Sequence, residues 1–541
     1  MSATWCRVTS AASLAFCLIA SSCFGQTSLP EKGLSIGINV NRISDYNPSW
    51  VFTDALKQSR PWISFAYNPA TKEEKWNAGG PIELDELGMP KSLRRWTDEN
   101  GQPMQQRVGT LIFREIGDAY PSGLYQAQWQ GDGRVEFGLS ARIVKEGIGA
   151  NGVHWANVDV RARDAGILLK ITETNPKDPI RDLHLWMPDH GDVELARKPW
   201  KPGAKFSPFH PLFKERLAPF STLRFVDWTA TNWTTAHTWK ERTTYKHVRQ
   251  SGDKNGKGAA LELAIALANE TGKDVWINTP PWADDNYVRN MARLFRDTLN
   301  PDQKIYVEWA NELWNFAPGF ATHPWLKDQA NLASNQGRSV WQIAATNAKR
   351  DLQIWTEEFA DQPERLCRVV AGQSANPWIA KELIKNVGVK NIDAVACSAY
   401  VQLTAEQRQA FNAKTTASEI VAAGMQNLTR VRNELSAHKR LVDMCSKIAR
   451  RPIKLVCYEG GQHFDARGRQ VPYLDALFAA QSHADMEKLY DELLKITDDV
   501  GVQLMNHYAY VGRNSAHGSW GALSEQDQPL ETAPKYRALV K

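Results

Sequence analysis

The stretch IYVEWANELWN, residues 305–315, carries the clearest fold signal in this chain. It reads as a β-strand that ends in the pair Asn311-Glu312, with tryptophans on both sides. A second apolar strand, IKLVCYEGG, contains Glu459, which follows Glu312 by 147 residues (459 minus 312). Two carboxyl groups, each at the end of its own strand, are the minimum equipment for cleaving a glycosidic bond with retention of configuration.

Apolar strands alternate with amphipathic helices over the part of the chain after about residue 180. We expect helices at 258–270, 284–298, 338–359 and 485–497. We expect eight strands, at 183–188, 222–228, 274–280, 305–311, 365–372, 393–400, 453–460 and 502–508. This pattern predicts an α/β fold, a (β/α)8 TIM barrel, whose active site is assembled at the carboxyl ends of the strands. Glu312 would then close strand four and Glu459 strand seven.

A doubly wound parallel sheet is the competing fold for this alternation. Such a sheet would usually carry a Gly-rich phosphate-binding turn after its first strand, and no such turn is seen in the sequence. The barrel is therefore preferred.

The segment before the barrel has a different pattern. Short alternating stretches such as GLYQAQWQ and GRVEFGLSARIV are separated by Gly, Asp and Asn turns, which is typical of an antiparallel, jelly-roll-like β-sandwich. We therefore predict a signal peptide at 1–25, a β-sandwich accessory domain at 26–180 that precedes the barrel, and a catalytic barrel at 181–541.

The composition is that of a globular protein, with 43% hydrophobic residues and a formal net charge of only +5. Lys and Arg are scattered along the chain, so no nucleic-acid-binding surface is expected. The chain has 21 Trp. Tryptophan stacks on sugar rings, but it is also a large core residue, and we expect stacking chiefly from the tryptophans at strand ends.

The first 25 residues indicate export. Arg7 is followed by an apolar stretch from Ala11 to Phe24, which has the length and order of a secretory signal. No later stretch approaches the roughly 20 continuous apolar residues of a membrane span. We expect a soluble protein that is secreted or periplasmic, without a lipid anchor on Cys23.

Four cysteines remain once this segment is removed: Cys367, Cys397, Cys445 and Cys457. They permit three disulfide pairings, among which the sequence does not choose. Three of the four lie in expected strands, which favours buried free thiols. No Cys/His spacing indicates a metal site, and no organic cofactor is expected.

The combination of Asn311-Glu312 at the end of strand four with Glu459 at the end of strand seven resembles clan A of the glycoside hydrolases, retaining enzymes built on (β/α)8 barrels. The segments YVEWANELWN and YEGGQH also look like those of bacterial secreted cellulase-like or cellulose-binding proteins. The resemblance covers roughly residues 180–541. It implies that Glu312 is the general acid/base, Glu459 the nucleophile, and Asn311 a hydrogen-bond partner of the sugar 2-hydroxyl.

The two glutamates would need different environments, one protonated and one ionised, about 5–5.5 Å apart. Trp309 and Trp314 are candidates for the apolar side of Glu312. Glu308 lies deeper along the same strand, and we expect it to be structural, paired with Arg224. Arg224 could alternatively reach the nucleophile, as an arginine does in the enzymes that this chain resembles.

The remaining candidate substrate-binding residues follow the other strands. Tyr400 ends strand six, where it could donate to Glu459, and Trp520 is a candidate sugar platform after strand eight. Asp284 is the weakest candidate, because it also suits the N-cap of the next helix. The rest of the expected lining is Asp227, Trp228, Trp282, His463, Asn506 and His507.

The sequence thus predicts a secreted glycoside hydrolase that cleaves a β-linked polysaccharide by double displacement, with a polysaccharide or oligosaccharide as its partner. A carbohydrate-binding protein on the same barrel is the alternative, and a structural envelope protein is a third possibility. GLSIG (33–37) matches the serine nucleophile elbow, but it lacks a strand-turn-helix context and is discounted. The glycan, the oligomeric state and a role for the sandwich are left open by the sequence.

Overall fold

The structure is a computed structural model that describes residues 33–188, 198–252 and 256–541. The predicted signal peptide lies outside these ranges. Residues Leu34–Lys541 form one compact unit. Within the described ranges, no helix is long and apolar enough to cross a membrane.

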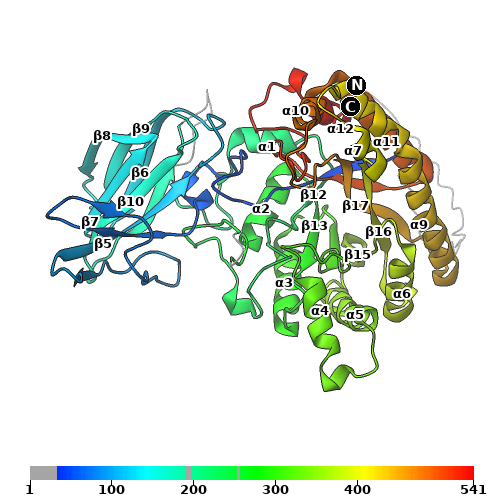
Figure 1. The fold of residues 1–541 in the computed structure, drawn as a ribbon. Helices are drawn as coiled ribbons and strands as arrows, with labels where there is room; N and C mark the ends of the chain where they lie inside the picture. The colour runs from blue at the N-terminus through cyan, green and yellow to red at the C-terminus, as the bar shows by residue number, and fades with distance from the viewer. Residues whose placement is uncertain (1–32, 189–197, 253–255) are drawn as a thin grey trace, which may run out of the picture. The chain divides into compact units, whose positions relative to one another are not determined.

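A closed eight-stranded parallel barrel forms the larger part of the fold, which confirms the predicted TIM barrel (Figure 1). The strands follow one another around the barrel in chain order and pair in parallel throughout. They are β1 (Ser35–Asn39), β12 (Thr222–Arg224), β13 (Asp274–Thr279), β14 (Ile305–Trp309), β15 (Leu366–Ala371), β16 (Ala394–Gln402), β17 (Lys454–His463) and β18 (Leu504–His507).

Side chains alternate along each strand, which gives the barrel two cores: one between the strands and the helices, and one inside the barrel. In β14, Ile305, Val307 and Trp309 face the helices and belong to the largest hydrophobic cluster. Tyr306 faces the other way, into the barrel, where its ring stacks on Trp276 at 5.4 Å. The interior of the barrel is therefore packed, and its chemistry is confined to the strand ends.

Helices cover the outside of the barrel strands (Figure 1). The four predicted helices are present, within three residues of the expected ends, as α2, α3, α5 and α11. The helices are α1 (Pro211–Leu217), α2 (Leu261–Thr271), α3 (Asp285–Thr298), α4 (Thr322–Ala330), α5 (Val340–Glu358), α6 (Pro377–Val387), α7 (Ala405–Ala410), α8 (Ala417–Gln426), α9 (Leu428–Ala449), α10 (Leu474–Ala479), α11 (Ala484–Val500) and α12 (Pro534–Leu539).

Two antiparallel sheets, drawn in blue to cyan in Figure 1, form the sandwich. Alternate residues of both sheets share one hydrophobic cluster, which includes Ile112, Leu169, Tyr125 and Val158. One sheet holds β3 (Glu74–Lys75), β2 (Ile63–Tyr67), β5 (Pro103–Ile112), β10 (Ile167–Thr174) and β7 (Gly133–Leu139), with β4 (Arg95–Thr97) paired to β5. The other holds β11 (Arg181–Trp186), β6 (Gly123–Gln130), β9 (His154–Val160) and β8 (Ala141–Ile148).

The first barrel strand differs from the prediction. The segment 183–188 was expected to be strand one, but β11 (Arg181–Trp186) pairs antiparallel with β6 in the sandwich. Strand one is instead β1, which pairs with β12 and β18. The sandwich is therefore inserted after strand one and does not precede the barrel. Because β1 takes the place that was predicted for 183–188, the other seven barrel strands keep their predicted numbers. β14 is therefore still strand four, and β17 is still strand seven.

Candidate active site

Glu312 lies just after β14, where the backbone leaves the extended conformation. Ala310 and Glu312 both have left-handed backbone angles, with φ of 59° and 42°. Side chains disfavour this region, so the turn is held by its surroundings. The Glu312 Oε1 accepts a hydrogen bond from the Tyr458 hydroxyl at 3.1 Å, and Oε2 accepts one from Asn315 Nδ2 at 2.7 Å.

Glu459 lies in β17 at an irregularity of the ladder. Cys397 pairs with Cys457, but the next residue, Ser398, pairs with Glu459, so Tyr458 is an extra residue on β17. Such a bulge re-aims side chains that strict alternation would send to opposite faces. Consequently Tyr458 reaches Glu312 while its neighbour Glu459 accepts a hydrogen bond from the Tyr400 hydroxyl at 2.9 Å.

Arg224, the last residue of β12, is the central donor of the site and is fully buried. Its Nη1 donates to Glu459 Oε1 at 2.8 Å, and its Nη2 lies 3.3 Å from Glu308 Oε2. It also donates to Asn39 Oδ1 at 2.9 Å and to Asn311 Oδ1 at 2.8 Å. The sequence left open whether Arg224 pairs with Glu308 or reaches Glu459, and in the structure its guanidinium group contacts both carboxyls.

Glu308 lies below the other carboxylates, with only 2% of the residue exposed. Its Oε2 accepts hydrogen bonds from Trp276 Nε1 and Asn278 Nδ2, each at 2.9 Å. Burial raises the pKa of Glu308, against the opposing effect of Arg224 and these donors. These contacts occupy Glu308 with protein groups, as expected for a structural carboxylate.

Burial also raises the pKa of Glu459, to about 8, against the lowering effect of the Arg224 charge. Repulsion from Glu312 adds to this rise, and the Tyr400 hydrogen bond opposes it. Arg224 and the Tyr400 hydrogen bond favour the ionised form of Glu459.

Several predicted binding residues gather around these carboxyls and remain partly exposed. The His463 ring contacts Tyr400 at 5.6 Å and Trp520 at 5.3 Å, measured between ring centroids. Asp227 accepts a hydrogen bond from the Tyr508 hydroxyl at 2.8 Å, and burial raises the pKa of Asp227. Asn311 is buried beside them, where its Oδ1 accepts a hydrogen bond from Arg224 and its Nδ2 donates to Asn232 Oδ1 at 3.2 Å.

Three predicted lining residues, Trp228, Asn506 and His507, are buried in the structure. Trp228 is 1% exposed and packs its ring among the phenylalanines of the main core, including Phe225 at 5.3 Å. Asn506 and His507 of β18 are fully buried. His507 Nε2 lies 3.1 Å from the Trp520 carbonyl oxygen, so this ring supports the Trp520 segment from below. Burial lowers the pKa of His507 to about 3, which keeps the ring neutral.

Trp309 and Trp314 separate in the structure. Trp309 faces the helices and contacts Trp325 at 6.4 Å, so it is not beside Glu312 as expected. Trp314 is partly buried against Tyr458, at 6.3 Å between centroids, and is the aromatic neighbour on the Glu312 side. Trp282 lies after β13 and contacts Trp325 at 6.4 Å. Asp284 is the N-cap of α3, which confirms the structural interpretation of this residue.

Sequence reasoning missed four residues of the site: Asn39, Asn232, Tyr458 and Tyr508. Asn39 ends β1, the strand that was not recognised, and its amide donates to the carbonyl oxygens of Tyr458 and His507. Tyr458 was overlooked because simple alternation places the residue before Glu459 on the opposite face. Asn232 and Tyr508 follow strands two and eight, so their position at strand ends was the available signal.

The four cysteines, Cys367, Cys397, Cys445 and Cys457, are free thiols and all are buried. Burial raises the pKa of Cys367 to about 12. The interpretation as buried free thiols is confirmed.

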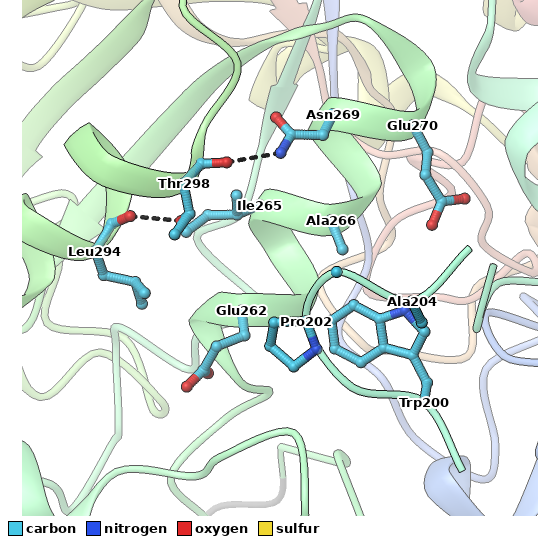
Figure 2. A pocket seen from close by; sticks show the side chains of 11 residues that line it. Trp200, Pro202, Ala204, Glu262, Ile265, Ala266, Asn269, Glu270, Leu294 and Thr298 are labelled. Atoms are coloured by element: carbon cyan, nitrogen blue, oxygen red, sulfur yellow. Dashed lines mark hydrogen bonds between the residues drawn. The ribbon is translucent and has the colours of Figure 1, made fainter. Parts of the chain in front are cut away.

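A pocket of about 280 Å³ lies on the outer side of the fold, away from these carboxyls (Figure 2). Figure 2 shows the Trp200 ring and Pro202 facing Ala266 and Ile265 of α2, with Leu294 and Thr298 of α3 beside them. None of the residues predicted for the site lines this pocket.

No protein-family model and no curated protein matches the chain. Solved structures similar to it include a GH51 arabinofuranosidase from Xanthomonas axonopodis pv. citri, at 11% identity and a TM-score of 0.43 over 63% of this chain and 67% of that one. A family 1 β-glucosidase from Thermotoga maritima is 13% identical, with a TM-score of 0.31 over 61% of this chain and 84% of that one. A GH5-4 endoglucanase from Clostridium acetobutylicum is 10% identical, with a TM-score of 0.33 over 61% of this chain and 88% of that one. These structures are glycoside hydrolases of three families, and the likeness is distant.

Proposed function

We propose that this protein is a retaining glycoside hydrolase in which Glu459 is the nucleophile and Glu312 the general acid/base. The observation that carries the proposal is the placement of the two carboxyls, with Glu312 just after strand four and Glu459 within strand seven, each with its own donors. Arg224 and Tyr400 stabilise an anion on Glu459, the state that a nucleophile needs.

The proposed reaction has two steps. Glu459 attacks the anomeric carbon while Glu312 donates its proton to the departing oxygen, which produces a glycosyl ester on Glu459. Glu312, now ionised, then takes a proton from water, and the water oxygen displaces the ester. The rate should depend on pH in a bell shape, because one carboxyl must be ionised and the other protonated.

Asn311 and the aromatic group around Trp520 would hold the sugar. Asn311 is fixed by Arg224 on one side and Asn232 on the other, which orients its amide beside the Glu312 turn. We propose that this amide binds the sugar 2-hydroxyl and that Trp520, in ring contact with His463 and Tyr508, is the stacking platform. The proposed substrate class is a β-linked polysaccharide.

Nucleophile replacement tests the catalytic assignment. Glu459→Ala should abolish turnover in a reducing-sugar assay over a polysaccharide panel, and azide should partly restore cleavage by forming a glycosyl azide. Glu312→Gln should lower kcat by roughly 10²–10⁴-fold. Glu492→Ala, on an exposed part of α11, is the matched control and should leave activity unchanged. Full activity in the Glu459→Ala variant would refute the assignment.

A non-catalytic carbohydrate-binding protein is the second candidate, because tryptophans at a barrel rim serve binding as well as cleavage. The same panel separates the two functions. In affinity electrophoresis, a polysaccharide in the gel should retard a binding protein, which releases no reducing ends. A hydrolase should release reducing ends from the same polysaccharide.

We also propose that the protein is exported, on the grounds of the apolar segment Ala11–Phe24. Amino-terminal sequencing of the protein recovered from culture medium or periplasm should find a start near Gln26. Recovery of the full-length chain from the cytoplasm alone would exclude export.

A further inference from the structure

A second cavity lies at the rim of the barrel, between the segments that follow strands two, three and four. Its volume is about 490 Å³, within the range of roughly 300–1,000 Å³ that is usual for small-ligand sites. Trp282 follows β13, His237 follows β12, and Trp325 belongs to α4. Because all carboxyl ends of barrel strands meet at one rim, this cavity lies on the same rim as Glu312.

Aromatic rings form one side of this rim cavity. Trp282 and Trp325 meet nearly edge to face, with centroids 6.4 Å apart and planes at 63°. The His237 ring lies 6.0 Å from Trp282 on another side. The Trp282 indole nitrogen is buried and has no hydrogen-bond partner in the part of the chain that the structure describes.

The rim cavity also has polar and basic lining residues. Amide and hydroxyl groups of Gln329, Asn335, Thr346 and Asn347 line it. Among the described residues, the acceptors of Arg338 are all neutral: Asn335 Oδ1 at 2.9 Å, the Gln342 carbonyl oxygen at 3.3 Å and the Thr346 hydroxyl.

Arg350, the other guanidinium of the cavity, differs from Arg338 in its partners. It pairs with Asp351 at 2.6 Å and with Asp285 at 3.4 Å. Among the ion pairs of the described residues, none joins Arg338 to a carboxylate. Arg338 thus brings a positive charge, without a counter-ion among the described residues, into a cavity with two tryptophans.

We propose that the rim cavity is a second sugar-binding subsite that takes a sugar carrying a carboxylate, that is, a uronic acid of the substrate chain or of its branches. The tryptophans offer stacking faces, and the Arg338 guanidinium offers a positive charge and its remaining N–H donors to a carboxylate. The inference rests on the proposed function in one respect, that the acidic sugar belongs to the glycan that is cleaved. It narrows the substrate class from β-linked polysaccharides in general to acidic ones.

Equilibrium binding to the Glu459→Ala variant tests the subsite without any turnover. Glucuronate and galacturonate are the probes, and their uronamides are the matched neutral ligands with the same ring. Binding is measured by saturation-transfer NMR at roughly 10 mM ligand, a concentration about tenfold above a Kd of 1 mM. At least one of the two uronates should bind. The corresponding uronamide should bind at least about tenfold more weakly. Failure of both uronates to bind overturns the proposal.

Variants assign the binding to the cavity. Arg338→Gln should remove the preference for the charged ligand, Arg338→Lys should keep part of it, and Trp282→Ala should weaken the uronate and the amide alike. Arg432→Gln, an exposed arginine on α9, is the control and should leave binding unchanged. Uronate binding that is equal in the Arg338→Gln and parent proteins overturns the assignment. A negative result here leaves the catalytic proposal standing, because turnover is measured separately with the native carboxyls.

Discussion

At the scale of single residues, the fully buried guanidinium of Arg224 stabilises the candidate site most directly. It hydrogen-bonds the carboxylates Glu459 and Glu308 at the same time. Breaking a buried charge pair by removing one partner leaves the other charge uncompensated in a medium that solvates it poorly. Both the stability and the chemistry of the site therefore depend on this side chain.

Replacing Arg224 with methionine tests this dependence. We expect the free energy of unfolding to fall by about 3–5 kcal/mol, because two buried carboxylates lose their cation. Urea denaturation followed by circular dichroism measures the change. Arg432→Met, which breaks an exposed pair with Asp499, should change the free energy of unfolding by less than about 1 kcal/mol. Equal stability of the two variants would contradict the described network.

Tyr400 influences Glu459 through one hydrogen bond, and this bond lowers the pKa of the carboxyl. Tyr400→Phe removes the donor, so the pKa of Glu459 should rise. Since Glu459 must be ionised to attack, the acidic limb of the kcat/KM profile should move to higher pH, by roughly one unit for the loss of about 1.5 kcal/mol. Tyr125→Phe, in the sandwich, is the control. A limb that stays in place or moves to lower pH would refute the nucleophile role.

At the scale of elements, Asp284 is the N-cap of α3, and a variant tests whether it also binds substrate. Its side chain accepts a hydrogen bond from the Tyr287 amide at 2.6 Å. Asp284→Ala should lower the free energy of unfolding by about 1 kcal/mol and leave kcat and KM unchanged, because the lost bond belongs to the helix cap. Asp284→Asn keeps the cap and should restore most of the stability. A change in KM with unaltered stability would instead support substrate binding.

The bulge in β17 is the second element that matters for function. It turns two consecutive residues, Tyr458 and Glu459, toward the carboxyl pair, where each makes a separate hydrogen bond. A regular strand would send one of them to the helix side. The site thus depends on one irregular position in an otherwise regular barrel.

At the scale of the whole molecule, the insertion of the sandwich after β1 determines which fragments can fold. The domain boundary expected from sequence suggests residues 181–541 as an independent barrel. That fragment lacks β1 and leaves β12 and β18 with unpaired edges. We expect it to be insoluble or to unfold without a cooperative transition, whereas residues 33–541 should give a single sigmoidal urea curve. A soluble, cooperative 181–541 fragment would contradict the described barrel closure.

The sequence by itself determined the fold class, the numbers of strands four and seven, and the carboxyls Glu312 and Glu459, because these depend on local periodicity and on residues at strand ends. It also identified Tyr400, Asp227 and Trp520, which lie around those carboxyls. Only the tertiary structure decided that Ser35–Asn39 is strand one, since its partner strands lie far away in the chain. Local patterns do not say which strands pair, nor how deeply a strand-end residue such as Trp228 or His507 is buried. Those properties arise from long-range packing, which also brings Arg224, Asn39 and Tyr458 into the same site.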